Sequence, residues 1–355
     1  MAGKRILLIT SSPLADDGIT QIVMAVIKAY CGFIKFEVAS CFGFNNRYGA
    51  ELAAKKITCH TLPQKKKPFK YMFAIRKLVK QEKYDSVYIH GNSAMMFLES
   101  IPSKIAGAQV ITHCHNTMSA YPVVHYLMKP FFNLSVDKKI GCSSLASKWA
   151  YYGKKVITIP NGVELDRFTF NADVRKKTKK ELGWTDQKIV GHIGRLNKQK
   201  NHARVISIFD KMRKMDDHAR LLLIGDGVLY DEIVNAIAIR HLTDYVKIIR
   251  YSSRLQDYMQ AMDVMILPSM YEGLCLVALE AQANGLPVLA NCSLSPETFA
   301  TKKAIAIDLS LQDEELAEYA LEMMKNGRDD VIDQLREKEM DQSDMLRLIG
   351  EVLTS

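Results

Sequence analysis

The stretch 264–291, VMILPSMYEGLCLVALEAQANGLPVLAN, contains a complete strand–helix–strand unit. VMILPS is a short apolar run that predicts a buried strand ending at Ser269, and MYEG is the loop after it. We expect a helix to begin at residues 274–276 and to stop at Asn284-Gly285, because this pair followed by Pro287 is typical of a helix C-terminus. LPVLAN predicts the second strand. Two strands joined by a crossover helix are parallel.

The same alternation runs along the whole chain. The first block has the apolar segments RILLIT, FEVAS, SVYIH, QVITHCH, KKIGCS and VITIP, and the pattern restarts at KIVGHIG, followed by ARLLLIG and YVKII. A polar segment without a strand, 161–187, separates the blocks. The sequence therefore predicts an α/β fold of two doubly wound, Rossmann-like domains, 1–165 and 166–340. A C-terminal helix at 341–355 can pack back on the first domain.

Composition excludes some classes and leaves others open. The chain has 355 residues, 48% of them hydrophobic and 25% charged, and no apolar run approaches the ~18 residues of a membrane span. Seven cysteines without a Cys-x-x-Cys pair favour reduced thiols in the cytoplasm. The net charge of +9 suits a phosphate-rich ligand, nucleic acid or an anionic membrane. Nucleic acid is disfavoured, because the basic runs near 65–70 and 175–180 lack interleaved aromatics beyond Phe69 and Tyr71.

Two acids flank the apolar part of the opening stretch. Glu272 is expected in the loop at the carboxyl end of the strand, and Glu280 one or two turns inside the helix. Ligands of doubly wound sheets bind beyond the carboxyl ends of the strands. Both carboxylates could accept bonds from sugar hydroxyls, and the free amides after Gly273 suit an anion. The alternative is two surface acids, which is weakened at Glu280 because an unpartnered carboxylate among apolar neighbours is costly.

A basic cluster follows the strand KIVGHI, in the sequence GHIGRLNKQKNH. Arg195 and Lys200 lie in a loop before a predicted helix, where two cations can clamp a diphosphate. The alternative is a solvated loop, which is common in so basic a chain. Gly225 and Gly227 in IGDGVL permit close backbone approach, although a tight turn explains them equally well.

Together these motifs resemble the retaining glycosyltransferases of family four, which have the GT-B fold of two Rossmann-like domains facing across a cleft. EGLCLVALEAQANGLP is similar to that family's pair of Glu residues separated by seven positions. GRLNKQKNH, GDGVL and IPNGVELDRF occur in the family's order and at roughly its spacing. IHGNSAMMFLE and ITHCHNT look like the bacterial branch that builds capsule and exopolysaccharide. The resemblance spans most of the chain and is strongest at 155–291.

The resemblance implies a role for each matching position. Arg195 and Lys200 match the pair that binds the donor diphosphate, and Glu280 matches the acid that holds the nucleotide ribose. Glu272 matches the acid near the donor sugar, and His115 matches the histidine that faces this sugar. The expected catalytic residues are therefore Glu272, His115, Arg195 and Lys200. The donor-binding set adds Glu280 and the positions Gly18, Gly225, Gly227, Gly273, Leu274, Cys275 and Leu276.

Two loops depart from the family's pattern. The first loop often has paired glycines, but here it has Asp17-Gly18. The nucleobase loop usually carries a glycine after its strand, but here it is IIRYSSRLQD. A UDP-sugar donor is therefore implied by the family alone.

The resemblance implies no metal and no cofactor, because cations and helix dipoles neutralise the leaving diphosphate. His113 and His115 share a strand face, as two metal ligands would. No third ligand is evident nearby in the sequence. We expect His113 to be a core residue, His115 to belong to the active site, and no metal to be bound.

A basic, aromatic segment at 63–80, PQKKKPFKYMFAIRKLVK, suggests contact with an anionic membrane. It combines Lys65, Lys66, Lys67, Lys70, Arg76, Lys77 and Lys80 with Phe69, Tyr71, Met72 and Phe73. The alternative is an ordinary amphipathic helix in which Phe73, Ile75, Leu78 and Val79 pack inward.

The resemblance thus implies a retaining, metal-independent hexosyltransferase. Its partners would be a nucleotide sugar, a glycan or lipid-linked acceptor in capsule or exopolysaccharide synthesis, and the inner face of an anionic membrane, but no nucleic acid. No side chain stands out as an enzymic nucleophile, and the resemblance implies that the leaving phosphate helps to remove the acceptor proton. The alternatives are another GT-B enzyme, such as a nucleotide-sugar epimerase, and a non-catalytic basic binding protein.

Overall fold

The chain forms two compact units in the computed structural model, which describes residues 4–15, 17–44, 46–153 and 155–355. The first unit comprises 1–161, 272–274 and 343–355, and the second comprises 162–271 and 275–342. The sequence placed the boundary near residue 165. Within the described residues, no helix has both the length and the apolarity to cross a bilayer.

The first unit is built on a parallel, doubly wound sheet. The strand order reverses between β1 (Arg5–Thr10) and β4 (Ser86–Gly91), which pair directly. The order across the sheet is β3 (Thr58–Thr61), β2 (Lys35–Ser40), β1, β4, β5 (Gln109–Cys114), β6 (Lys138–Gly141) and β7 (Val156–Thr158).

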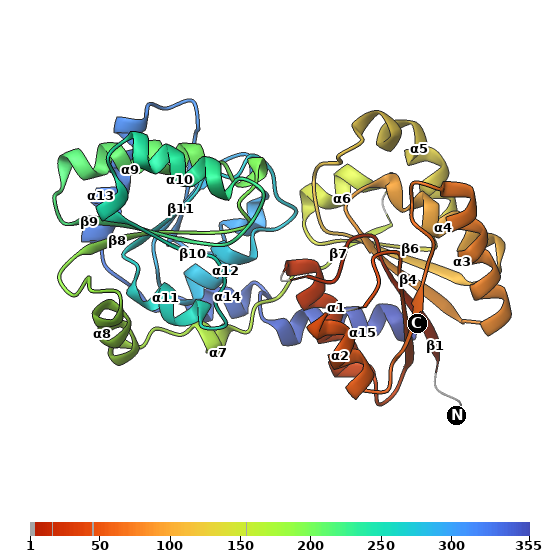
Figure 1. The fold of residues 1–355 in the computed structure, drawn as a ribbon. Coiled ribbons are helices and arrows are strands. Elements are labelled where there is room, and N and C mark those ends of the chain that lie inside the picture. The colour runs from red at the N-terminus through yellow and green to blue at the C-terminus, as the bar shows by residue number, and fades with distance from the viewer. Residues whose placement is uncertain (1–3, 16, 45, 154) are drawn as a thin grey trace. The chain divides into compact units, whose positions relative to one another are not determined.

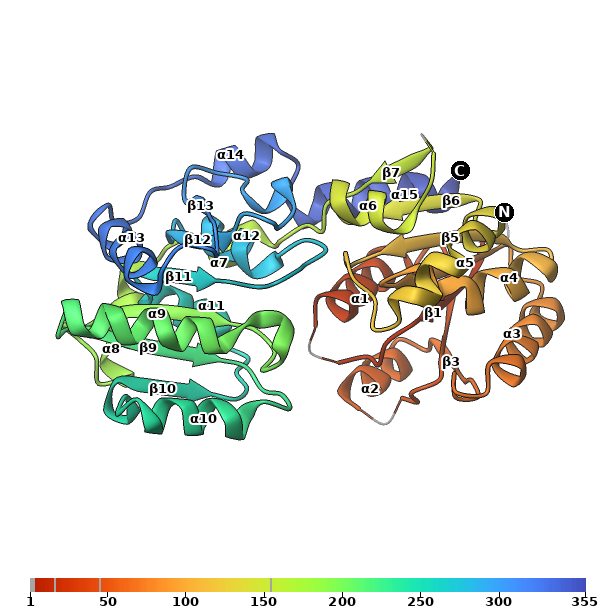
Figure 2. The ribbon, with the colours of Figure 1, turned by 90° about the horizontal axis from the view of Figure 1, so that it is seen from above.

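Helices cover both faces of this sheet (Figures 1 and 2). One core joins the sheet to α1 (Gly18–Tyr30), α2 (Arg47–Ala54) and the C-terminal α15 (Gln342–Thr354). The other core joins it to α3 (Pro68–Glu82), α4 (Phe97–Ile105) and α5 (Pro122–Ser135). The helices α6 (Ser144–Ala150) and η1 (Ala94–Met96) complete the unit.

The second unit repeats this architecture with a sheet whose order reverses between β8 (Lys188–Ile193) and β11 (Val264–Leu267). The order is β10 (Val246–Ile249), β9 (Ala219–Ile224), β8, β11, β12 (Val288–Asn291) and β13 (Ala304–Ile307). The helices are α7 (Leu165–Phe168), α8 (Ala172–Glu181), α9 (His202–Met215), α10 (Tyr230–Ile239), α11 (Leu255–Ala261), α12 (Leu276–Ala283), α13 (Asp313–Lys325) and α14 (Ile332–Glu337), with the short η2 (Lys198–Lys200), η3 (Thr243–Tyr245) and η4 (Pro296–Thr298).

The prediction of two doubly wound parallel sheets is confirmed. In the opening stretch, β11, α12 and β12 follow one another as expected, although β11 ends at Leu267 rather than Ser269. The sequence missed β3 and β13. Each has four residues and lies at the edge of its sheet, where its side chains are largely exposed or half-buried. β3 is polar, and β13 is an apolar run of only four residues.

The basic segment forms α3, and two expectations about its aromatics were wrong. Tyr71 is fully buried, and its hydroxyl donates to Glu99 Oε1 (2.8 Å) inside the unit. Lys65 pairs with the same buried carboxylate (2.6 Å), so it is not a free surface cation. Phe73, which the alternative packed inward, is exposed. Ile75 and Val79 do pack inward.

Candidate active site

Two loops meet where the strand order of the second unit reverses, the usual ligand position in such sheets. One follows β8 and contains Arg195 and Lys200, and the other follows β11. The amide of Met270 donates to the carbonyl of Gln199 (2.8 Å), and Gln199 Nε2 donates to the carbonyl of Tyr271 (2.8 Å). These bonds hold the two loops together at the carboxyl ends of their strands.

Glu280 lies on α12 and is buried, with 8% of its surface exposed. Its Oε2 atom has no hydrogen-bond partner among the described residues. Burial raises the pKa of Glu280 to about 7, while the nearby charges of Arg167 and Lys200 lower it and Glu164 raises it further. A buried carboxylate with an unused acceptor is costly unless a ligand supplies the donor.

Lys200 shares this environment with Glu280. Its aliphatic stem lies over Gly194, where an added Cβ would come within 3.0 Å of Lys200 Cδ. Its charge also lowers the pKa values of His192 and His202, which burial already lowers. Arg167 belongs to the IPNGVELDRF motif, but the sequence did not single it out. The structure therefore places the charges of Lys200 and Arg167 near Glu280, and the roles of Lys200 and Glu280 toward a donor stay predictions.

Arg195 lines an open pocket with Gly227, Val228 and the ion pair formed by Asp226 and Arg250. Arg250 donates to both carboxylate oxygens of Asp226, at 2.9 and 3.0 Å. This pair holds the pKa of Asp226 below its usual value. The sequence did not single out Arg250.

The glycines of the Gly-Asp-Gly turn allow two loops to approach each other. A Cβ at Gly225 would lie 2.0 Å from the carbonyl oxygen of Gly194, and one at Gly227 would lie 2.5 Å from that of Leu196. The amide of Leu196 donates to the carbonyl of Asp226 across the same gap (2.9 Å). Packing thus accounts for both glycines, and their contact with a donor stays a prediction.

The loop 272–274 belongs by its contacts to the first unit, together with His115. Thr117 Oγ1 donates to the carbonyl of Glu272 (3.0 Å), and Ser143 Oγ donates to that of Gly273 (2.5 Å). A Cβ at Gly273 would lie 2.0 Å from the carbonyl oxygen of His115, so only glycine fits. The structure therefore brings Glu272 and Gly273 close to His115. Their roles toward a sugar stay predictions.

The N-cap residue of α12, Cys275, makes no side-chain hydrogen bond to the amides of the first turn. Leu274 and Cys275 lead into this helix, and Leu276 is its first residue. The positive end of the helix dipole can therefore serve an anion. Gly18 opens α1 directly after Asp17, whose side chain accepts from the amide of Thr20 (2.9 Å). The donor-binding role of Gly18 stays a prediction.

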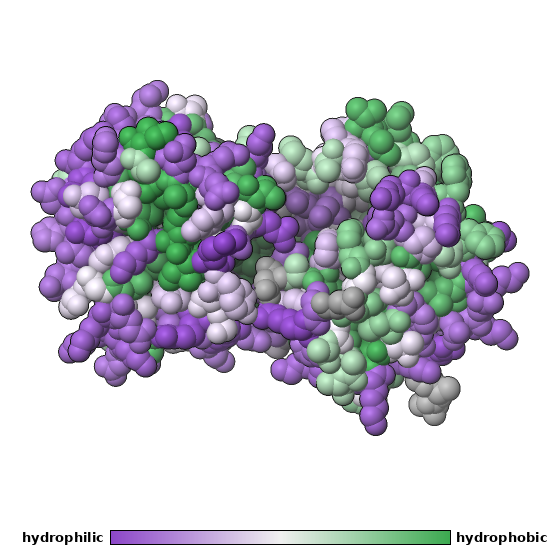
Figure 3. All heavy atoms as spheres, in the orientation of Figure 1, coloured by the Kyte–Doolittle hydropathy of each residue, from purple (hydrophilic) through white to green (hydrophobic). Residues whose placement is uncertain are grey.

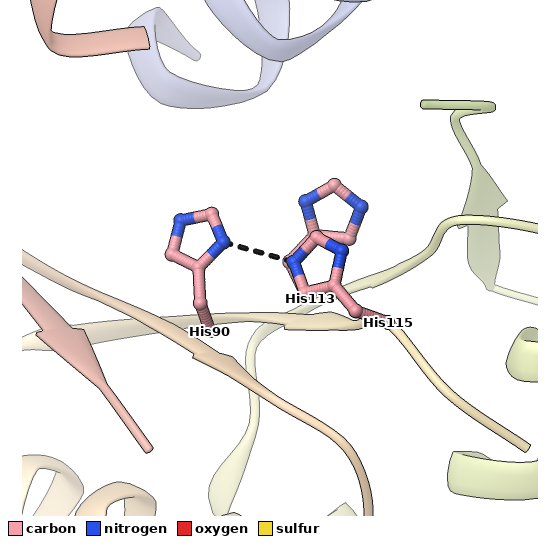
Figure 4. A group of neighbouring side chains, drawn as sticks. All are labelled: His90, His113 and His115. Atoms are coloured by element: carbon pink, nitrogen blue, oxygen red, sulfur yellow. Dashed lines mark hydrogen bonds between the residues drawn. The ribbon is translucent and has the colours of Figure 1, made fainter. Parts of the chain in front are cut away.

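His90 joins His113 and His115 in a buried cluster at the carboxyl ends of β4 and β5 (Figure 4). Strand pairing sets His90 opposite His113, and His90 Nδ1 lies 2.9 Å from His115 Nε2. His113 Nδ1 lies 2.9 Å from the hydroxyl of Tyr88. Burial lowers all three pKa values, that of His115 to about 3 although Asn161 opposes the shift. All three rings are therefore neutral at pH 7.

This cluster corrects the expectation that no third ligand lies near His113 and His115. One nitrogen from each of the three histidines lies within 4.8 Å of the others. Neutral imidazoles suit zinc, copper or nickel. No carboxylate joins the group in the described part of the chain, and a metal would have to replace the bond between His90 and His115. The expected independence from metal stays a prediction.

Comparison with known proteins shows what the second unit is similar to and which fold the whole chain has. Residues 174–339 match the family model of glycosyl transferases group 1. EpsF of Bacillus subtilis, which is named as a glycosyltransferase, is 26% identical over 275 residues, or 71% of each chain. An Escherichia coli UDP-Gal:alpha-D-GlcNAc-diphosphoundecaprenol alpha-1,3-galactosyltransferase is 27% identical over 63% of this chain and 62% of its own length.

A similar solved structure is HepE of Anabaena in complex with UDP. It has a TM-score of 0.80 at 18% identity, over 99% of both chains. The chain as a whole therefore has the GT-B glycosyltransferase fold, and its residues 174–339 are similar to the glycosyl transferases group 1.

Proposed function

We propose that the chain transfers a sugar from a UDP-sugar to a glycan or lipid-linked acceptor in capsule or exopolysaccharide synthesis, with retention of configuration. The similar Anabaena protein is solved with UDP and with UDP-glucose. The name of the E. coli relative includes a UDP-Gal donor and a diphosphoundecaprenol-linked acceptor. The motifs that resemble the polysaccharide-building branch support the same pathway class.

The buried, unpartnered carboxylate oxygen of Glu280 carries this proposal. Vicinal ribose hydroxyls would donate to Glu280 and satisfy it. Lys200, whose charge acts on Glu280, would then neutralise the diphosphate of the same nucleotide. The uncapped N-terminus of α12 would add a second positive potential for this leaving group.

The residues of the first unit would act on the transferred sugar. His115 is neutral, because burial lowers its pKa to about 3. It would therefore exchange hydrogen bonds with a sugar hydroxyl rather than supply a positive charge. Glu272, in the neighbouring loop, would accept bonds from the same sugar. The negative charge that develops as the glycosidic bond breaks would be stabilised by the cations Lys200 and Arg195.

Calorimetry with intact nucleotide sugars tests the donor site. We expect a UDP-sugar to bind, and Lys200→Ala to weaken its binding by about tenfold or more, since a charge-assisted contact contributes ~1.5–3 kcal/mol. Glu280→Ala should have a similar effect. Lys198→Ala is the matched control, because Lys198 is an exposed cation of the same short helix η2. Equal affinity of the Lys200 and Lys198 variants, or preference for another nucleotide, would reject the assignment.

A further inference from the structure

An apolar stripe runs along the outer face of α5. Val123, Tyr126, Leu127, Phe131 and Leu134 are each 57–82% exposed. Large apolar side chains normally occur singly on a protein surface, and a contiguous group marks an interaction site. Figure 3 shows hydrophobic residues gathered over this helix.

The stripe lies opposite the face by which α5 packs on its own unit. At about 100° per residue, Val123, Leu127 and Leu134 fall within about 40° of one another, and Phe132 lies on the far side. Phe132 is fully buried in the core with β5 and α4. The inner face also holds His125, which stacks on Trp149 of α6 with ring centroids 3.9 Å apart. The helix is therefore fixed by one face and leaves a second apolar face without a partner in its own unit.

The sequence that carries the stripe is basic. Residues 100–160 contain seven lysines and a single acid, Asp137. Asp137 follows the C-terminus of α5 and is already paired with Lys104 (2.5 Å). On the other side, the exposed Lys148 belongs to α6, and its carbonyl accepts a bond from Lys129 of α5 (3.1 Å).

More cations lie on the next helices of the same sheet face. α4 packs against both α5 and α3. α3 and the residue before it expose Lys67, Lys70 and Lys77, with Phe69 and Phe73 between them. An apolar stripe with tyrosines and a basic border has the composition of a surface that lies in a bilayer interface.

We propose that the outer face of α5 docks on an anionic lipid bilayer, with Leu127, Phe131 and Leu134 entering the apolar boundary and the exposed lysines Lys67, Lys70, Lys77 and Lys148 contacting the headgroups. This rests on the proposed function, because a membrane surface is where a lipid-linked acceptor would be met. In this proposal the main membrane contact is α5 rather than the basic segment 63–80, because Tyr71 and Lys65 of that segment already bind the carboxylate of Glu99. The positive charge around the stripe favours a bilayer over a second copy of the chain as the partner. In a symmetric pair the same lysines of the two copies would face and repel each other.

Vesicle sedimentation of the full chain tests this. We expect the protein to pellet with phosphatidylglycerol–phosphatidylcholine vesicles, and less so when salt is raised or phosphatidylglycerol is omitted. The triple variant Leu127→Ser, Phe131→Ser, Leu134→Ser should lower the partition coefficient at least about tenfold, because it removes the buried apolar area. The control Phe33→Ser, Ile239→Ser removes equally exposed apolar side chains elsewhere and should pellet like the wild type.

Three outcomes overturn the proposal: a wild type that stays in the supernatant, a triple variant that pellets undiminished, and a wild-type dimer that the triple variant splits without any vesicle binding. Light scattering detects the last. Calorimetry with the UDP-sugar, measured on the triple variant without lipid, should match the wild type. A failure of the proposed function would appear there, whereas a failure of the membrane contact would leave that binding intact.

Discussion

Glu280 is the single side chain whose environment most constrains the chemistry. Burial raises its pKa to about 7, whereas a Glu in an unfolded chain titrates near 4.3. The folded state therefore holds this proton more tightly than the unfolded state. The contribution of Glu280 to the free energy of unfolding is neutral below pH ~4 and becomes increasingly unfavourable as the pH rises to about 7.

We therefore expect Glu280→Gln to stabilise the second unit at pH 8 by about 3 kcal/mol, and to change little at pH 4.5. Urea unfolding at the two pH values measures the difference. Glu51→Gln, at an exposed acid of α2, is the control and should show no such contrast. An equal effect of Glu280→Gln at both pH values would show that the carboxyl does not titrate in this range.

Among single residues, the sequence singled out Glu280 and Lys200 as candidate site residues because both lie in recognisable motifs. It missed His90, which is 25 positions before His115 and meets it only because β4 pairs with β5. A signal was present, since SVYIH and QVITHCH are consecutive predicted strands that both end in histidine. Register, which the sequence does not specify, decides whether such residues become neighbours.

Among the elements, the loop between β11 and α12 is tightly packed. Its Gly273 lies against the backbone of His115, where a methyl group would be 2.0 Å from the carbonyl oxygen. The loop must move if a side chain is added, and Glu272 and the first turn of α12 must move with it.

We expect Gly273→Ala to lower kcat/KM by about 10²-fold, because a displacement of about 1 Å in a catalytic site has effects of this size. Gly32→Ala is the matched control, since nothing lies within 4 Å of a Cβ there and its backbone is not in the left-handed region. A transferase assay on both purified variants gives the comparison. Wild-type turnover of Gly273→Ala would mean that this close approach is not needed for activity.

The elements that the sequence predicted and those it missed differ in burial. β1 and β8 have almost wholly buried side chains and stand out as apolar runs. The edge strand β3 is Thr-Cys-His-Thr and has no such run. In α3 the helix was predictable, but the partner of Tyr71 was not, because Glu99 comes from α4.

For the molecule as a whole, the stereochemistry of transfer and the need for metal can both be predicted. We expect the product to keep the donor's anomeric configuration, and the rate to be unchanged by chelator, since Lys200 and the α12 dipole can replace a metal at the diphosphate. Proton NMR of the first product, before mutarotation, gives the configuration. Metal analysis of the purified protein should find much less than one ion per chain.

An inverted anomer would reject retention. One equivalent of zinc that disappears in His90→Gln, together with activity lost to chelator, would instead assign the histidine cluster as a metal centre. These results are independent, because the first concerns the reaction path and the second the cluster at β4 and β5.

At this scale the sequence indicated two domains, because the strand pattern stops in the polar segment 161–187 and then restarts. It also predicted a C-terminal helix at 341–355 that packs back on the first domain, and α15 does so. α15 is separated from α1 by more than three hundred residues, yet Met345, Ile349 and Leu353 share a core with α1 and β1. The individual contacts of α15 depend on tertiary packing, which the sequence does not specify.

Both chain ends therefore belong to the first unit, where Lys4 Nζ donates to the carbonyl of Leu353 (2.9 Å). The second unit is in effect an insert, attached at the junctions 161/162 and 342/343. A circular permutant, in which residues 4 and 353 are linked and the chain is opened at another loop, should thus keep the fold, because these two positions are adjacent. The insert could also be exchanged for that of a relative at these two junctions, provided that the host keeps its own residues 272–274. The donor preference of such chimeras would show directly which unit of the protein selects the sugar nucleotide.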